Sequence, residues 1–437
     1  MLSIINCKYL VTQDSDLNIF KNYSLIIKED KILDILPQKD ALKKYHNITN
    51  IINFDNRAVL PGLINAHTHL PATFMRGYAD DLPLETWLRK KIWPVENQIM
   101  CREFVYDASV YSIGEMLLNG ITCFNDMFFF SEDIARAADD CKVRANIGTH
   151  IFDYPTPWVE DPDLYIKQGV EVYNKYKNHK LISTSLNPHA PYSVSDDTFI
   201  KVRDEAEKYN MKVCCHLHET KKEVRKSLKQ YGMRPVERLN KLGILNSNFQ
   251  AVHMTQWKDD EIELFKEKDI KVIHCPESNL KLSSGICPTQ RLFRHGITVG
   301  IGTDGAASNN DLDILAEMRM ASLLAKSYNQ DPTAMPAIEV LNMATINNAE
   351  VMGLENEIGS LEINKQADFI AIDMDQLNTQ PLFDLTSQLI YSTNSYQVTD
   401  VFVAGKQLVR NRELLLFSKD YLFGLANKWK ERIKSLG

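Results

Sequence analysis

Histidines and acids stand at the ends of short apolar segments throughout the middle of this 437-residue chain. Each segment has the length and composition of a buried β-strand that is closed by a polar residue. Because parallel strands present their carboxyl ends at one edge, we expect these side chains to converge on one site. The residues concerned are His67, His69, His189, His216, His218, Glu219, His253, His274 and Asp304.

The pair His67 and His69 has the i, i+2 spacing that places two side chains on one face of a strand. An H-x-H pair alone is a weak signal, since two polar histidines at a strand end need not bind metal. Together with His216 and Asp304, the pair gives three neutral nitrogens and one carboxylate. This donor set suits Zn²⁺ or Fe²⁺ and leaves a position for water, so we predict a site for a divalent cation.

The chemistry expected at such a site is hydrolysis, because a divalent cation lowers the pKa of its water from 15.7 toward about 7. Asp304 is predicted to be a ligand and the acceptor of the water proton, with a purely structural ligand as the alternative. Glu219 is predicted to protonate a ring nitrogen of the substrate, with a surface glutamate as the alternative. His253 is predicted to hydrogen-bond the attacking oxygen. The residues alone leave open whether His218, two positions after His216, also binds the ion.

Eight apolar strands that alternate with longer helical stretches must position these groups. This pattern favours a closed (β/α)₈ barrel, whose catalytic groups lie at the carboxyl ends of the strands. An open doubly wound sheet is the alternative, but no G-x-G-x-x-G motif or P-loop supports it. The predicted strands cover residues 60–70, 120–127, 143–152, 181–193, 212–220, 249–256, 271–279 and 298–305.

Both ends of the chain are rich in short strands. Residues 1–58 contain several of them between turns, and further apolar runs lie at 368–373 and 398–409. We therefore predict a small β-sandwich domain from residues 1–58 and 364–437, with a C-terminal helical tail. Residues 59–363 are predicted to form the barrel.

Composition narrows the class of protein. A formal charge of -7 argues against nucleic acid or an anionic membrane as the main partner. The eight cysteines contain no C-x-x-C pair and give no disulfide framework. The N-terminal sequence lacks a signal-peptide pattern, and no apolar run reaches membrane-spanning length. We predict a cytoplasmic protein that binds neither nucleic acid nor membrane.

Six motifs carry a resemblance to a known family: LPGLINAHTHL, NPHAPYSVS, HLHET, AVHMT, HCPESNLKL and GTDGAASNNDLD. They resemble the amidohydrolase superfamily. Within it, the chain is similar to the methylthioadenosine/S-adenosylhomocysteine deaminases, which are related to the triazine hydrolases. The likeness covers nearly the whole chain. GTDGAASNNDLD together with HLHET is far more specific to this family than H-x-H, which marks only the superfamily.

The resemblance implies a distorted (β/α)₈ barrel with a β-sandwich from both termini. It also implies one divalent metal ion, zinc in the first place, with iron or manganese as alternatives. One ion is expected because strand four offers no lysine that could be carbamylated to bridge two ions. The resemblance makes His218 a non-ligand. It gives Glu219 and His253 the roles described above. The implied ligands are His67, His69, His216 and Asp304.

The implied activity is hydrolytic removal of the 6-amino group of an adenine nucleoside, which yields the inosine form and ammonia. Four substrate contacts rest on the resemblance only: Glu96 on the ribose hydroxyls, His189 on the purine edge, Trp87 against the nucleoside and Ser308 nearby. Trp87 as a core residue, Glu96 as a solvated acid at a helix start and Ser308 as a helix cap are the alternatives.

The tail of the substrate is where the chain departs from the family pattern. Some members bind the amino-acid tail of S-adenosylhomocysteine through arginines after strand three, where this chain reads NIGTHIFDYPTPWVED. We therefore expect methylthioadenosine, adenosine or 5′-deoxyadenosine to be substrates at least as good. Phe152, Tyr154 and Trp158 are candidates for the wall of a 5′ pocket.

The main alternative function keeps the scaffold and changes the substrate. It is an amino- or chlorohydrolase of a free heteroaromatic ring of the triazine or pterin type, for which the ribose-binding Glu96 would have no purpose. By analogy with related barrels, we also expect a homo-oligomer.

Overall fold

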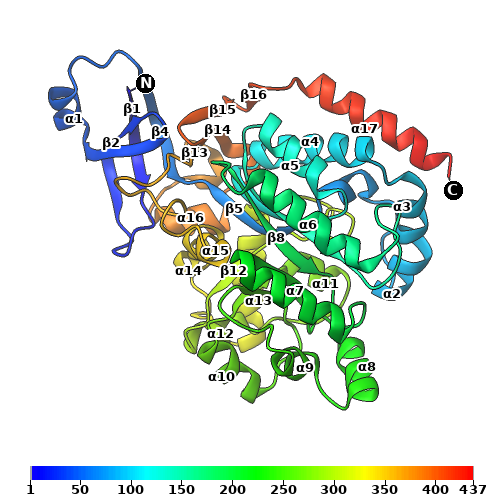
Figure 1. Cartoon of the computed structure of the whole chain (residues 1–437). Coiled ribbons are helices and arrows are strands. Elements are labelled where there is room, and N and C mark those ends of the chain that lie inside the picture. Colours follow the sequence, from blue (N-terminus) through cyan, green and yellow to red (C-terminus); the bar gives the residue numbers. More distant parts are fainter. Residues whose placement is uncertain (1, 437) are drawn as a thin grey trace.

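Two sheets of eight strands each organise residues 2–436, which are the residues that this computed structural model describes (Figure 1). The first is a parallel, barrel-like sheet from the middle of the chain. The second, called the terminal sheet here, is a mixed sheet with strands from both ends. The predicted combination of a barrel with a small β-rich part from both termini is confirmed.

All eight predicted barrel strands form, and they follow one another around the barrel in sequence order. Neighbouring strands are parallel and mostly buried on both faces, as expected where helices cover the outside. They are β5 (Leu63–Thr68), β6 (Ile121–Phe128), β7 (Arg144–Ile151), β8 (Ile182–Pro188), β9 (Lys212–Leu217), β10 (Phe249–His253), β11 (Lys271–His274) and β12 (Val299–Ile301).

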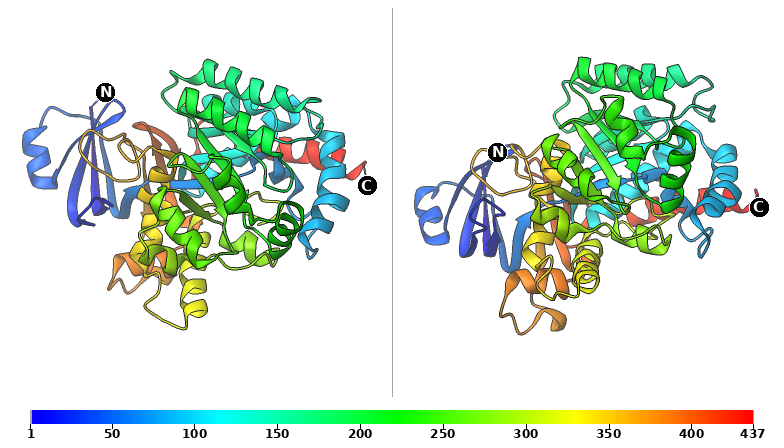
Figure 2. Two further views of the ribbon diagram at one scale, coloured as in Figure 1. Left: turned by 60° about the horizontal axis from the view of Figure 1, so that its bottom comes forward. Right: turned by 90° about the horizontal axis from the view of Figure 1, so that it is seen from below.

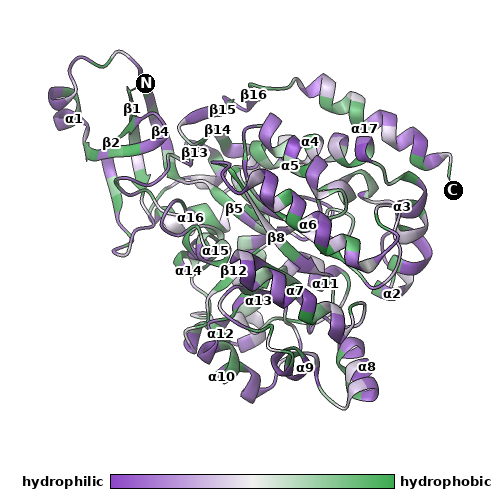
Figure 3. Cartoon of the chain, in the orientation of Figure 1, coloured by the Kyte–Doolittle hydropathy of each residue, from purple (hydrophilic) through white to green (hydrophobic). Residues whose placement is uncertain are grey.

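Helices between these strands coat the barrel. They show both hydrophobic and hydrophilic residues along their length, as α6 and α7 do in Figure 3, because one face packs inward and the other meets solvent. They are α4 (Arg102–Leu118), α5 (Ser131–Asp140), α6 (Pro162–Tyr176), α7 (Asp196–Tyr209), α8 (Lys221–Tyr231), α9 (Pro235–Lys241), α10 (Asp259–Glu267), α11 (Pro276–Lys281), α12 (Thr289–Arg294), α13 (Ile314–Asn329), α14 (Ala337–Ala344) and α15 (Ile346–Met352).

The seam between the last strand, β12, and the first, β5, is closed by close approach and by one side chain. A Cβ on Gly302 would lie 2.7 Å from the backbone nitrogen of His67, so only glycine permits this contact. The Nδ2 group of Asn348 donates to the carbonyl oxygens of Ile64 (2.6 Å) and Ile301 (2.8 Å). Its Oδ1 accepts from the Ile301 amide at 2.8 Å. Asn348 therefore links β5 to β12 and closes the barrel next to the strand that carries the predicted metal ligand His67.

Replacing Asn348 with leucine is expected to destabilise the protein by about 2–4 kcal/mol, because three buried backbone groups lose their partner. Urea unfolding followed by circular dichroism would show a lower midpoint. Asn356→Leu, at an exposed position, is the matched control and should leave the midpoint in place. An unchanged midpoint for Asn348→Leu would contradict the role of Asn348 in linking β5 to β12.

The terminal sheet joins the two chain ends around β4, which pairs in parallel with β1 and antiparallel with β13. A buried ion pair between Arg144 of β7 and Asp368 (Nε to Oδ2, 2.9 Å) fixes this sheet to the barrel. The domain boundaries at residues 58 and 364 stay predictions. In spatial order the strands are β16 (Glu413–Leu414), β15 (Lys406–Arg410), β14 (Val398–Val403), β13 (Phe369–Asp373), β4 (Ile51–Pro61), β1 (Leu2–Val11), β2 (Ile19–Lys28) and β3 (Lys31–Pro37).

The C-terminal helix α17 (Lys419–Lys434) returns to the barrel and lies along α4, away from the terminal sheet (Figures 1 and 2). Its Trp429 is fully buried against Phe104, and the indole nitrogen donates to Asp107 at 2.8 Å. Smaller elements are α1 (Gln38–Lys44), η3 (Leu377–Thr379), α16 (Leu385–Tyr391) and η4 (Ser395–Gln397). Within residues 2–436, no helix has the length and apolar character needed to cross a membrane.

Candidate active site

The predicted chemical residues gather in one cavity at the carboxyl ends of the barrel strands. Elements η1 (Leu70–Met75), α2 (Leu84–Trp87), η2 (Leu88–Ile92) and α3 (Trp93–Ile99) follow β5, and α2 to α3 form one wall. His67 lies just inside, fully buried against His69 and His216. The other predicted site residues line the cavity: His69, Trp87, Glu96, His189, His216, Glu219, His253, Asp304 and Ser308.

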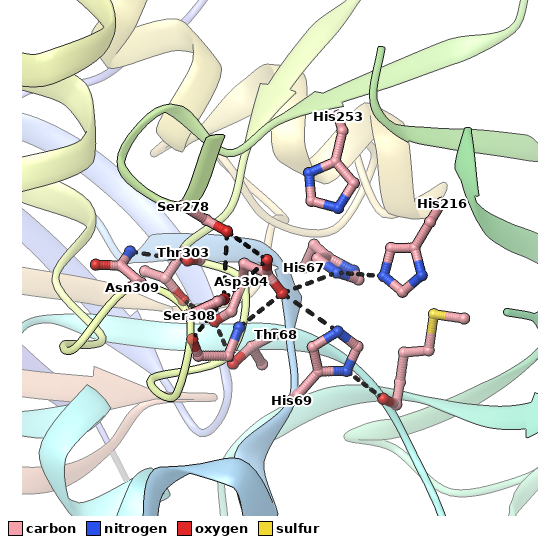
Figure 4. A network of polar contacts seen from close by, with 12 residues as sticks. His67, Thr68, His69, His216, His253, Ser278, Thr303, Asp304, Ser308 and Asn309 are labelled. Atoms are coloured by element: carbon pink, nitrogen blue, oxygen red, sulfur yellow. Dashed lines mark hydrogen bonds and ion pairs between the residues drawn. The ribbon is translucent and has the colours of Figure 1, made fainter. Parts of the chain in front are cut away.

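The four predicted metal ligands converge from β5, β9 and the loop after β12 (Figure 4). Nε2 of His67 lies 3.1 Å from Nε2 of His216 and 3.6 Å from Oδ1 of Asp304. Nε2 of His69 lies 3.2 Å from the same carboxylate oxygen. The ligand atoms of His67, His69 and Asp304 lie within 4.8 Å of one another, as do those of His67, His216 and His253.

Hydrogen bonding shows that this cluster fits a cation. Nδ1 of His69 donates to the carbonyl of Met127 (2.5 Å), so in a neutral ring Nε2 bears a lone pair. That lone pair faces the carboxylate of Asp304, which is a repulsive contact. The Nε2 atoms of His67 and His216 also face each other, and at most one of them can carry a proton at this distance. A divalent ion resolves both contacts. The nitrogen and oxygen donors suit zinc, and an imidazole whose other nitrogen is bonded to a carbonyl is the usual ligand arrangement.

Asp304 is held by hydroxyl groups on the side away from the histidines. Ser278 Oγ donates to Oδ2 at 2.6 Å and Ser308 Oγ at 3.1 Å, while Oδ1 accepts from the Gly305 amide at 2.7 Å and faces the cluster (Figure 4). The residue adopts a positive φ of 62°, a strained conformation for a non-glycine residue that these contacts support. Ser308 therefore hydrogen-bonds Asp304 and also lines the cavity. Its contact with substrate stays a prediction.

His253 has a fixed proton arrangement. The amide Nδ2 of Asn279 donates to Nδ1 of His253 at 3.0 Å, so a neutral ring carries its hydrogen on Nε2. Burial, the largest effect, lowers the pKa of His253 to about 4. A neutral ring with an Nε2 hydrogen suits hydrogen bonding to an oxygen rather than metal binding. His189, across the cavity, pairs its Nδ1 with the hydroxyl of Ser193 at 2.7 Å.

Glu219 is a buried acid on the same cavity as the metal cluster. Burial, with a smaller contribution from the charge of Asp304, raises the pKa of Glu219 to about 7. Ser284 Oγ donates to its Oε1 at 3.1 Å. A carboxyl group with such a pKa holds its proton near neutral pH, as a general acid must. The alternative of a surface glutamate is wrong.

Glu223 is a residue that the sequence interpretation missed. Its two carboxylate oxygens accept from the backbone amides of His218 (2.9 Å) and Glu219 (2.8 Å), while Thr220 Oγ1 accepts from the Glu223 amide (3.1 Å). The spacing T-x-x-E of a helix capping box is a signal that would have found it. Glu223 therefore fixes the loop that carries Glu219.

His218 points away from the metal cluster. The Val236 amide donates to its Nε2 at 3.2 Å, and its positive φ of 51° breaks the alternation expected after His216. The period-two spacing therefore does not bring His218 to the ion. His274, Cys214 and Cys215 are buried in the barrel, and none of the three is among the residues that line the cavity.

The outer wall of the cavity is formed by α2 and α3. Glu96 and Trp87 are 9% and 8% exposed, so Glu96 is not a solvated acid at a helix start. Burial raises the pKa of Glu96 to about 7. Trp87 both packs in the core and lines the cavity. These positions are compatible with the predicted substrate contacts, which remain predictions.

Aromatic rings make up the wall at the ends of β6 and β7. Phe129 and Phe152 lie with ring centroids 5.7 Å apart, and Tyr154 lies 4.8 Å from Phe152. His150, which the sequence interpretation did not single out, stands among them. Among the described residues that line the cavity, none is arginine or lysine. Apart from His150, the described rings of this wall offer the cavity mainly apolar surface.

Comparisons with known proteins agree with this geometry. The amidohydrolase family profile matches residues 58–408. A 5-methylthioadenosine/S-adenosylhomocysteine deaminase of Teredinibacter turnerae is 44% identical over 415 residues, which cover 95% of this chain and 94% of that protein. A 5′-deoxyadenosine deaminase of Methanobrevibacter smithii is 39% identical over 414 residues, 94% of each chain.

Solved structures show the same fold. An adenosine deaminase from Xanthomonas campestris with bound zinc has a TM-score of 0.97 at 42% identity, covering 99% of this chain and 98% of that one. An atrazine chlorohydrolase from Arthrobacter aurescens complexed with zinc has a TM-score of 0.91 at 22% identity, covering 97% and 99%. The second likeness concerns the fold alone.

Proposed function

The chain belongs to the amidohydrolase family, and we propose that it removes the 6-amino group of adenine nucleosides by hydrolysis, releasing ammonia and the inosine form. The observation that carries this proposal is one cavity in which a buried, protonatable Glu219 shares a wall with a His₃Asp cluster. Relatives named as deaminases of adenine nucleosides cover nearly the whole chain and support the substrate class.

The metal is held by the three histidines and the aspartate described above, with zinc as the first choice and iron or manganese as alternatives. When bound, the ion supplies Lewis acidity that makes water a nucleophile at neutral pH. Asp304 is the proton acceptor for that water, because its Oδ1 faces the cluster while Ser278 and Ser308 hold Oδ2.

The other polar groups act on the purine. Glu219 gives its proton to N1, which makes the adjacent C6 electrophilic, and Asp304 passes one water proton to the departing amine. As the C6–N bond breaks and the C6 carbonyl forms, the remaining hydroxyl proton returns to the carboxyl groups and restores protonated Glu219. His253, with its hydrogen on Nε2, donates to the attacking oxygen. Burial of these groups strengthens each interaction, because little water competes for it.

Substrate recognition follows the walls of the cavity. We assign Glu96 to the ribose hydroxyls, His189 to the purine edge and Trp87 to a face of the nucleoside, since all three line the cavity. The residues that line this cavity include no arginine or lysine, and the basic side chains of the adjoining pocket, Arg89, Lys222, Lys226 and Lys281, lie outside it. Methylthioadenosine, adenosine and 5′-deoxyadenosine are therefore proposed to be at least as good substrates as S-adenosylhomocysteine.

The test is a direct assay of purified, zinc-loaded protein on these four nucleosides. Deamination should lower the absorbance near the adenine maximum and release one ammonia for each nucleoside consumed. The comparison of kcat/KM among the four tests the order of preference. A protein inactive on every nucleoside and active on a ribose-free triazine or pterin would refute the proposal.

Replacing Glu223 with alanine is expected to lower kcat about 10–100-fold, because a group that orients a catalytic residue from behind has effects of this size. Two buried amides lose their acceptor, and the backbone of Glu219 is no longer fixed. Steady-state kinetics with adenosine, together with metal analysis, would measure this. Glu263→Ala, at an exposed position on α10, is the control. A kcat within twofold of wild type would exclude the positioning role.

A further inference from the structure

His150 closes strand β7 and lines the active-site cavity, yet the proposed mechanism does not use it. The side chain is buried, with 5% of its surface exposed. Among residues 2–436, neither Nδ1 nor Nε2 finds a hydrogen-bond partner. A buried polar group without a partner is costly, so two such atoms on one ring require an explanation.

No side chain beside His150 hydrogen-bonds it in the described structure. The ring centroids of Phe152 and Phe129 lie 4.4 and 5.3 Å away, and these rings are apolar. His189 lies 5.1 Å away and His69 6.1 Å away, and each already uses its Nδ1 on another group. Because the ring lines the cavity, a molecule bound there can supply the missing partner.

We propose that His150 is a specificity-determining residue that hydrogen-bonds a non-reacting polar atom of the bound nucleoside. The inference rests on the proposed function. The reacting N1–C6 edge must face Glu219 and the metal ligands, and Glu219 follows β9, two strands along from β7. The atoms considered for His150 are therefore N3 or N7 of the purine, or the 2′- or 3′-hydroxyl of the ribose.

An imidazole is suited to this task because it offers both a donor and an acceptor within a flat ring. It brings a polar ring into the wall of Phe129 and Phe152, so a hydrogen bond to it fixes how the nucleoside lies against those rings. A site that leaves such a buried group unpaired discriminates against any analogue that lacks the partner atom.

The experiment combines His150→Phe with altered nucleosides. Phenylalanine keeps the aromatic wall and removes both ring nitrogens. Wild type and variant are assayed with adenosine, 3-deazaadenosine, 7-deazaadenosine, 2′-deoxyadenosine and 3′-deoxyadenosine, and an analogue that is not turned over is scored by its inhibition constant. We expect the variant to lose about 10–100-fold in kcat/KM on adenosine, as for a hydrogen bond to a buried partner. For one analogue, this loss should shrink to within threefold.

Phe152→Leu is the matched control, because it alters the same wall without touching a polar group. Its effect should be equal on all five nucleosides. If His150→Phe fails to fold, as judged by metal content and circular dichroism, His150→Leu is tested with the same nucleosides, since leucine also removes both ring nitrogens.

Two results would overturn the inference. One is a His150 variant whose kcat/KM on adenosine stays within twofold of wild type. The other is an equal loss on all five nucleosides, which would make His150 a packing residue only. In both cases wild type still deaminates adenosine, so the failure is separate from that of the proposed function, which would appear as wild type inactive on every nucleoside.

Discussion

Glu219→Gln is expected to lower kcat about 10³-fold while the protein still binds one equivalent of metal. Loss of a positioned general acid costs about 10²–10⁴-fold in rate. Glutamine has the shape of the glutamic acid and accepts the hydroxyl of Ser284 through its amide oxygen, but it has no proton to give to N1. Steady-state kinetics on adenosine and metal analysis of the same preparation measure the two quantities.

Glu219 lines the same cavity as the metal cluster but is not one of the four predicted ligands. Its replacement is therefore expected to affect proton transfer and not metal binding. A drop in kcat with an unchanged metal content assigns the loss to proton transfer. Unchanged turnover would remove Glu219 from the mechanism. A parallel loss of metal would show that it acts as a ligand instead. Asp260→Asn, on the exposed surface of α10, controls for loss of one negative charge.

Asp304→Asn is expected to lower kcat/KM by about 10⁴-fold or more and to weaken metal binding. Asparagine keeps the size of the side chain, but it removes the anionic ligand and the acceptor of the water proton at once. The remaining His67, His69 and His216 are neutral, so the cation loses its only charged partner within the cluster. Turnover and zinc content after dialysis against a weak chelator would measure both losses.

Ser278→Ala is the matched variant for this prediction, because it removes a hydroxyl that bonds Oδ2 of Asp304 and leaves the carboxylate in place. It should retain metal and lose about 10-fold in kcat, which is the size of effect expected when a group that hydrogen-bonds a metal ligand is removed. Full turnover of Asp304→Asn at a normal zinc content would contradict the proposed acceptor role. Equal losses in both variants would mean that orientation, rather than charge, dominates.

Much of the fold could be predicted because the barrel repeats one local pattern. Each strand is a short, buried apolar run, and each run closes with a polar residue, so the sequence alone indicates eight strands and the edge at which chemistry occurs. The same logic predicts the cluster of His67, His69, His216 and Asp304. The H-x-H spacing works for β5 because its residues keep the alternation of a strand.

The same spacing fails at His216 and His218, since the chain leaves β9 after Leu217 and turns with a positive φ at His218. His69 and His218 each lie one residue past their strand, with an extended backbone at His69 (φ −129°) and a left-handed one at His218 (φ 51°). The conformation of that single residue decides which side chain meets the ion, and sequence patterns locate such turns poorly. Glu223 had a detectable signal as part of a helix cap. Asn279 and Ser278 carried none of their own, because their roles depend on which side chains β10 and β12 bring beside them.

The sequence by itself therefore determined the barrel, the terminal strands, the metal-ligand types and an acid near them, because those features depend on local periodicity and residue chemistry. Only the tertiary structure decided which hydrogen bonds fix His69, His253 and Asp304, and which buried nitrogens of His150 stay unpaired. These properties arise between residues far apart in the chain. Their energies depend on distance and burial, which no local pattern encodes.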